Sequence, residues 1–151
     1  MDFSYDNVLE FFRNYFETFN KYGQDPATID KMDDYFHPDL KFLPYVADVS
    51  PAYSRQEFKD VLISHPSGYE KLTPLDIVYD ERKHVAVIMI LAEISDSKTG
   101  ELLVKKHYFV RYPLVLDDKN TVKIKELNFF WEVLPAGSME LNDVFARDWN
   151  K

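Results

Sequence analysis

The sequence predicts a single α+β domain in which three helices precede a long antiparallel sheet. Helix-like patterns fill the first part of the chain, and strand-like segments separated by short turns fill most of the rest. The length of 151 residues suits one hydrophobic core, so residues 1–151 are expected to form one domain. Aromatic residues make up 16% of the chain, enough both to fill a core and to line a cavity.

The first predicted helix starts at Asp6 or Asn7, either of which can cap it, and ends at Gly23. Its apolar side chains recur at helical spacing and define one buried face: Val8, Phe12, Tyr15, Phe16 and Phe19. Tyr15 on this face is either a core tyrosine or a ligand contact, and in both cases its buried hydroxyl needs a hydrogen-bond partner.

Two more helices are expected before residue 70. Asp25-Pro26 favours a helix start, because Asp is a good cap and Pro is tolerated in the first turn. This helix should end before Pro38, and a short strand should follow over Asp39–Val46. The clearest local signal is Ser54-Arg55-Gln56-Glu57, a capping box in which two side chains satisfy free backbone N–H groups. The third helix should end at Pro66-Ser67-Gly68.

Four segments rich in Val, Ile, Leu and aromatic residues predict strands: Leu75–Tyr79, His84–Ile94, Glu101–Leu116 and Thr121–Leu134. Short turns link them, so strands adjacent in sequence should pair antiparallel. Long strands in a small domain must twist and curve, which leaves a conical space between the sheet and its helices. A tail with Ser138 as a cap and apolar residues up to Trp149 predicts a final amphipathic helix.

Composition argues against several classes of partner. A net charge of −8 disfavours nucleic acid and anionic membrane surfaces as partners. The absence of cysteine excludes disulfides and thiolate catalysis, and the four histidines lack metal-ligand spacing. We therefore expect no metal and no cofactor. The N-terminal residues are acidic and lack a signal-like apolar segment, which favours a cytoplasmic protein.

Several short motifs resemble the NTF2-like superfamily of cone-shaped α+β domains. Arg13–Glu17, Tyr22–Asp25 and Tyr35–Asp39 resemble its helical opening. Ser54–Phe58 is similar to its third-helix signature, and Val122–Glu126 resembles its last-strand motif, with Val in place of Gly. The superfamily includes ketosteroid isomerase, scytalone dehydratase, limonene epoxide hydrolase, SnoaL-type cyclases and proteins without catalysis, so the resemblance alone does not decide function.

The resemblance carries over to single residues only in part. Tyr15 stands where ketosteroid isomerase has the tyrosine that donates a hydrogen bond to the enolate oxygen. The catalytic aspartate of that enzyme would fall near Leu43-Pro44-Tyr45, where no carboxylate is in register and Asp48 is the closest acid. Limonene epoxide hydrolase would have an aspartate where Phe129 stands. The resemblance thus implies a cavity that lacks two acids of its relatives.

The segment around His107 has two possible orientations. Strand alternation puts Lys105, His107, Phe109 and Arg111 on one face and Lys106, Tyr108, Val110 and Tyr112 on the other. If the first face is inward, His107 with Arg111 forms an acid–base pair or binds a ligand carboxylate. If the second is inward, Tyr108 and Tyr112 line an aromatic pocket. Register against the last-strand motif favours the second.

The Phe129-Phe130-Trp131 run places rings on both faces of its strand. The resemblance directs Phe129 and Trp131 toward the pocket, which leaves Phe130 on the opposite face. Apolar side chains on both faces fit a ligand pocket on one side and a homodimer interface through the sheet on the other. Tyr45 and Tyr53 flank the Asp48 loop and are expected to cover the pocket or to pack beneath it.

These observations favour a cofactor-independent isomerase, dehydratase or cyclase that acts by proton transfer on a small apolar, cyclic or aromatic molecule. Tyr15 would polarise an oxygen of the substrate, with His107 or Asp48 as the base. The alternative is a non-catalytic ligand-binding or protein-interaction module of the same fold, which the missing acids favour.

Overall fold

A computed structural model describes residues 2–65, 67–134 and 136–146 of the chain. The predicted positions Pro66 and Trp149 lie outside these ranges. The helices are α1 (Tyr5–Tyr22), the 3₁₀ helix η1 (Ile29–Asp34), α2 (Arg55–Leu62) and α3 (Leu141–Phe145). The strands are β1 (Phe36–Pro44), β2 (Gly68–Asp80), β3 (Val85–Asp96), β4 (Leu102–Leu116) and β5 (Val122–Trp131).

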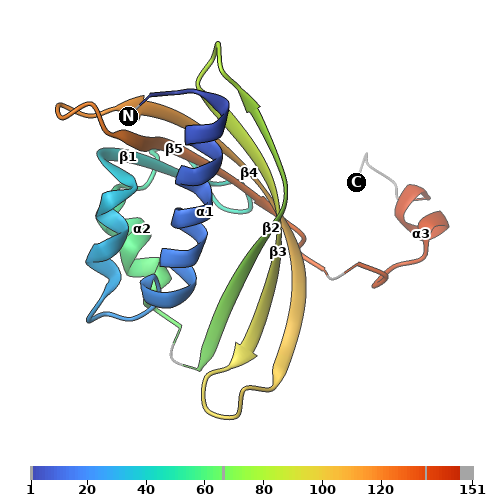
Figure 1. Cartoon of the computed structure of the whole chain (residues 1–151). Coiled ribbons are helices and arrows are strands. Elements are labelled where there is room, and N and C mark those ends of the chain that lie inside the picture. Colours follow the sequence, from blue (N-terminus) through green and yellow to red (C-terminus); the bar gives the residue numbers. More distant parts are fainter. Residues whose placement is uncertain (1, 66, 135, 147–151) are drawn as a thin grey trace.

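One five-stranded sheet in the order β1-β5-β4-β3-β2 forms the body of the molecule. Strands β2 to β5 pair antiparallel, and β1 pairs parallel to β5. The long strands curve around α1 and α2, which lie on the same face of the sheet (Figure 1). The α+β prediction with a curved sheet is therefore confirmed.

The helix ends follow the cap chemistry of the sequence. Ser4, rather than Asp6 or Asn7, caps α1, and Gly23 ends it. Any side chain at Gly23 would place its Cβ 2.9 Å from the carbonyl oxygen of Phe19. The expected capping box is present at α2, where Ser54 Oγ accepts from the Glu57 N–H at 3.1 Å and Glu57 Oε1 from the Ser54 N–H at 3.1 Å.

The second predicted helix is only the six-residue 3₁₀ helix η1, and α2 follows β1, in the order expected from the predicted strand over Asp39–Val46. Two α-helices and one 3₁₀ helix thus stand where three helices were expected. The tail forms the short α3, whose N-cap residue is Glu140 rather than Ser138. Its described residues are exposed, and it extends away from the sheet (Figure 1).

Both edge strands are longer than predicted, because each contains a proline that sequence reasoning treated as a break. β1 starts at Phe36, before Pro38, and β2 starts at Gly68 and runs through Pro74. Proline cannot donate a hydrogen bond to a neighbouring strand, but an edge strand has a neighbour on one side only and tolerates it. The sheet register shifts next to both prolines.

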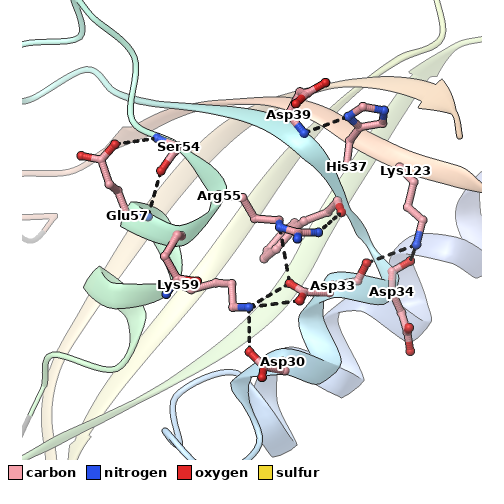
Figure 2. A network of polar contacts seen from close by, with 12 residues as sticks. Asp30, Asp33, Asp34, His37, Asp39, Ser54, Arg55, Glu57, Lys59 and Lys123 are labelled. Carbon is pink, nitrogen blue, oxygen red and sulfur yellow. Dashed lines mark hydrogen bonds and ion pairs between the residues drawn. The ribbon is translucent and has the colours of Figure 1, made fainter.

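A charged network joins α2 to η1 and to the sheet (Figure 2). Lys59 Nζ on α2 donates to Asp30 Oδ1 at 2.7 Å and to Asp33 Oδ1 at 3.0 Å. Arg55 Nη1 donates to the carbonyl oxygen of Phe36 at 3.3 Å, and Lys123 Nζ to that of Asp34 at 2.7 Å. These contacts fix α2 over the open side of the curved sheet.

Among the residues that the structure describes, no helix combines the length and the apolar character that a membrane span requires.

Candidate functional site

A cavity of about 520 Å³ lies between the inner face of the sheet and helices α1 and α2. This volume falls within the range of small-molecule sites. Apolar and aromatic side chains form most of the wall, and among them are Phe19, Phe42, Phe58, Leu62, Leu72, Ile90, Val110 and Leu127. Apart from the tyrosines, the titratable side chains among its described lining residues are Glu70, His65 and Lys106.

Six of the predicted site residues line this cavity: Tyr15, Tyr53, Tyr108, Tyr112, Phe129 and Trp131. Cross-strand register explains why they meet, since Tyr108 pairs with Trp131 and Val110 with Phe129 on adjacent strands. The face of β4 with Tyr108 and Tyr112 is therefore the inner one. Of the two orientations left open for this strand, the structure has the second.

His107 lies on the opposite face of β4 and does not reach the cavity. Its Nδ1 is 2.9 Å from Glu132 Oε2, and nearly half of its side chain is exposed. The backbone N–H of His107 donates to the same carboxylate and lowers the pKa of Glu132. Arg111 Nη1 donates instead to Asn128 Oδ1 at 2.9 Å. The structure thus forms no His107–Arg111 pair at the cavity.

Asp48 and Tyr45 also lie outside the cavity, although Pro44 and Ala47 of the same turn after β1 line it. The Ala47 N–H donates to the Pro44 carbonyl oxygen at 2.9 Å, which closes this turn. Asp48 is exposed, and its Oδ1 accepts from the Ser50 N–H at 3.0 Å. Tyr45 stacks on Phe130 with ring centroids 4.4 Å apart, on the outer side of the sheet. The two predicted bases, His107 and Asp48, thus both lie outside the cavity that Tyr15 lines.

The carboxylate that the structure does place in the cavity belongs to Glu70 on β2. Its Oε2 accepts a hydrogen bond from the Tyr108 hydroxyl at 2.6 Å. Burial raises the pKa of Glu70, although the Tyr108 hydrogen bond and the charges of His65 and Lys106 lower it in part. Burial, together with the charge of Glu70, strongly raises the pKa of Tyr108, so the phenol stays protonated.

Two amide side chains hold this part of β2 in place. Gln24 Nε2 donates to the Glu70 carbonyl oxygen at 2.7 Å, and Gln24 Oε1 accepts from the Glu70 N–H at 2.7 Å. Asn20 makes the same pair of bonds with Leu72, both at 2.8 Å. Because both backbone groups of Glu70 are fixed, its side chain is directed inward with little freedom.

Sequence reasoning missed Glu70 because the strand was expected to begin at Leu75, after Pro74. A signal was nevertheless present in the strand lengths. Eleven residues were assigned to His84–Ile94, and a hairpin partner across a four-residue turn must be about as long. Counting back eleven residues from Tyr79 reaches Tyr69 and so includes Glu70, which pairs with Ile94 in the structure.

Tyr15 and Tyr112 form a second polar pair deep in the cavity. Their rings meet edge to face, 6.0 Å apart between centroids, and each hydroxyl shifts the pKa of the other. Burial raises the pKa of both phenols well above the ordinary value of tyrosine, so both remain protonated. The negative charge of Glu70 adds to this shift at Tyr15, which indicates that the carboxylate and the Tyr15 phenol share one site.

One hydrogen bond between two hydroxyls uses only one of their two protons. Such a pair can therefore still donate one O–H to a carbonyl or hydroxyl oxygen of a bound molecule. The cavity therefore combines one carboxylate, one spare phenolic donor and an apolar wall. Within the described ranges, no three or more His, Asp or Glu side chains gather closely enough to hold a metal ion.

Comparisons with known proteins place this geometry in a familiar fold. No sequence-family model matches the chain, and no curated protein does. Among solved structures, ActVI-ORFA from Streptomyces coelicolor is similar, with a TM-score of 0.65 and 13% identity over 86% of this chain and 98% of that one. An NTF2-like protein of unknown function from Exiguobacterium has a TM-score of 0.57 and 12% identity over 82% and 99%.

A third similar structure is SalBIII, an epoxide hydrolase/cyclase-like enzyme in pyran ring formation of the polyether salinomycin. Its TM-score is 0.59, with 16% identity over 87% of this chain and 95% of that one. These identities are too low to transfer an activity, but the agreement over nearly the whole length is clear. The chain has the NTF2-like fold.

Proposed function

We propose that this protein binds a small, largely apolar cyclic molecule in its cavity and catalyses a proton transfer on it without a cofactor. The observation that carries the proposal is the Glu70–Tyr108 pair, a carboxylate held by a phenol at 2.6 Å inside a largely apolar cavity. A carboxylate with a raised pKa is a better base toward carbon than an exposed one.

In this proposal Glu70 takes the base role that His107 and Asp48 cannot fill from outside the cavity. Glu70 removes a proton from a carbon next to a substrate carbonyl, and the C–H electron pair forms the enolate. The spare hydroxyl proton of the Tyr15–Tyr112 pair donates to the developing oxyanion. The protonated Glu70 then returns the proton either to another carbon of a conjugated enolate, which is isomerisation, or to a β-hydroxyl group that leaves as water, which is dehydration. SalBIII, an epoxide hydrolase/cyclase-like enzyme with a similar structure, supports a catalytic use of a cavity in this fold.

Hydrogen–deuterium exchange tests the proton transfer without knowledge of the natural substrate. Purified protein is incubated in D₂O with bicyclic aromatic ketones such as 2-tetralone, and deuterium uptake next to the carbonyl is followed by NMR. We expect the protein to accelerate exchange, and Glu70→Gln to reduce this acceleration by about 10²-fold or more, as for loss of a general base.

The matched control is Glu93→Gln. Glu93 lies on the neighbouring strand β3, between Ala92 and the cavity residue Ile94, so its side chain points to the outer face. This variant should exchange the ketone at the wild-type rate. Binding of the ketones without any exchange would reject the catalytic role and favour a ligand-binding module of the same fold.

We also propose that the protein forms a homodimer through the outer face of the sheet. Met89, Phe109 and Phe130 are cross-strand neighbours on β3, β4 and β5, and Tyr45 stacks on Phe130. We call these four residues the outer apolar row. Each is between 41% and 50% exposed, which is unusual for a continuous apolar row on a monomer.

A further inference from the structure

Glu70, Lys106 and His65 at the cavity differ in the contacts that they make with other described residues. Glu70 is engaged with Tyr108, whereas Lys106 has no ion pair within 4.0 Å and no side-chain hydrogen bond among the described residues. His65 likewise has no hydrogen-bond partner among them. The cavity wall therefore carries a free ammonium group and a free imidazole beside an apolar interior.

The position of Lys106 follows from the lengths of the strands. Pairing between β4 and β5 begins at Tyr108 and Trp131, so Lys106 lies where β4 extends beyond its neighbour. Its other neighbour, on β3, is Ala92, whose methyl group leaves space above the sheet. Lys106 is on the inner face, and alternation places it next to Tyr108 on the cavity side.

Exposure shows which end of the cavity this is. Tyr15 and Tyr112 lie at the opposite end of the cavity from Lys106, and both are 2% exposed. His65 is exposed and Lys106 is half-buried. The two basic side chains thus stand at the solvent side of the cavity, and the apolar rings and phenols occupy its interior.

We propose that the cavity binds an amphipathic acid, whose ring system fills the apolar interior and whose carboxylate or related anionic group is held at the mouth by Lys106 with His65. This inference deepens the proposed function, since it names the substrate class of the same site, and it rests on that function for the occupant of the interior. A chain with a net charge of −8 repels anions in general, so a preference for an acid requires a local cation.

The arrangement also orients the ligand. An anion at the mouth directs the opposite end of the molecule toward Tyr15 and Tyr112, and its middle passes Glu70 and Tyr108. Anchoring a remote group in this way fixes the reacting carbon against the base. An acid bound at Lys106 would place its reactive carbonyl or hydroxyl at the inner end.

Two naphthalene compounds of nearly equal size test the inference: 2-naphthoate, which is anionic, and 2-acetonaphthone, which is neutral. Their dissociation constants are measured by titration calorimetry at pH 7.5 for the wild type, Lys106→Gln and Lys105→Gln. Lys105 is the matched control, because it is the adjacent lysine on the outer face of the same strand.

We expect the wild type to bind 2-naphthoate about tenfold more tightly than 2-acetonaphthone, the value of one hydrogen bond to a charged group. Lys106→Gln should abolish this preference, and Lys105→Gln should keep it. His65→Gln should reduce it by a smaller factor. Thermal unfolding of each variant shows whether the fold is retained.

The two proposals fail in different ways. Equal affinity of the wild type for both compounds, or an unchanged preference in Lys106→Gln, would overturn the acid-binding inference and leave the cavity proposal in place. Failure of the wild type to bind either compound would overturn the proposed function itself, and the acid-binding inference with it.

Discussion

At the scale of single residues, the site depends on how burial and hydrogen bonding compete at one carboxylate. Burial raises the pKa of Glu70 above its ordinary value of 4.5, and the hydrogen bond from Tyr108 opposes that rise. Both effects come from side chains that face the cavity. His107 and Asp48 lack such an environment, since both lie at the surface.

A pH profile follows from this competition. Glu70 acts as a base only when ionised, so exchange of 2-tetralone should rise with pH through an apparent pKa above 4.5. Tyr108→Phe removes the contact that lowers the pKa of Glu70. The rising limb of the profile should therefore move to higher pH in this variant, and the ¹³C resonance of the Glu70 carboxyl group should titrate with it.

Tyr53→Phe provides the comparison for this measurement, because Tyr53 lines the same cavity but has no hydrogen bond to Glu70 among the described contacts. Its profile should coincide with that of the wild type. A Tyr108→Phe profile displaced to lower pH would contradict the assignment of Glu70 as the titrating base.

At the scale of elements, α2 covers the cavity through Phe58 and Leu62, and Lys59 on its other side holds it in place. Lys59 is only 4% exposed, yet its two acids differ greatly in exposure. The side chain of Asp30 is 87% exposed and that of Asp33 is 32% exposed. Screening by water should make the contact with Asp33 the stronger of the two.

The loss of stability on substitution should follow the same order as the strength of these contacts. We expect Lys59→Met to lower the free energy of unfolding by about 2 kcal/mol, since it removes hydrogen bonds between charged groups near the core. Asp33→Asn should cost more stability than Asp30→Asn, because water screens the exposed contact of Asp30 with Lys59. Urea denaturation followed by circular dichroism measures all three.

Lys41→Met is the control, because Lys41 is exposed on β1 and takes no part in the network. It should leave the stability unchanged. A larger cost for Asp30→Asn than for Asp33→Asn would show that burial does not set the strength of these contacts.

The success of sequence reasoning also varied by element. Caps and hairpins are local, so the Ser54 capping box, the end of α1 at Gly23 and the antiparallel neighbours were all predictable. The residues facing inward on β4 followed from alternation once the register was right. The two prolines could not be judged by themselves, because tolerance of proline depends on edge position, a property of the whole sheet. Glu70 was missed because Pro74 was treated as a break, although the length of the paired strand indicated that β2 extends past it.

At the scale of the whole molecule, the sheet has two unlike faces. The inner face is covered by α1 and α2 (Figure 1), and the outer face carries the outer apolar row. Covering that row in a second copy would remove four half-exposed apolar side chains from water, which favours association.

Sedimentation equilibrium tests this association. The wild type should sediment as a dimer of the 17.9 kDa chain, and Phe109→Glu, in the middle of the row, should shift it to the monomer. Leu141→Glu is the control, because Leu141 is 70% exposed on α3, which extends away from the sheet. It should remain a dimer, whereas a monomeric wild type would exclude the proposed interface.

The amides of Asn20 and Gln24, described above as supports of Glu70, have a further consequence for the sheet. They occupy the backbone groups of Leu72 and Glu70 that an additional strand would use, and Tyr53 does the same for Phe42 on β1. Free strand edges template the growth of sheets between molecules, and blocked ones do not. Templated aggregation at the Glu70 end of β2 would first require the C-terminal end of α1 to detach. The residues that position the carboxylate thus also protect the native protein from edge-to-edge growth.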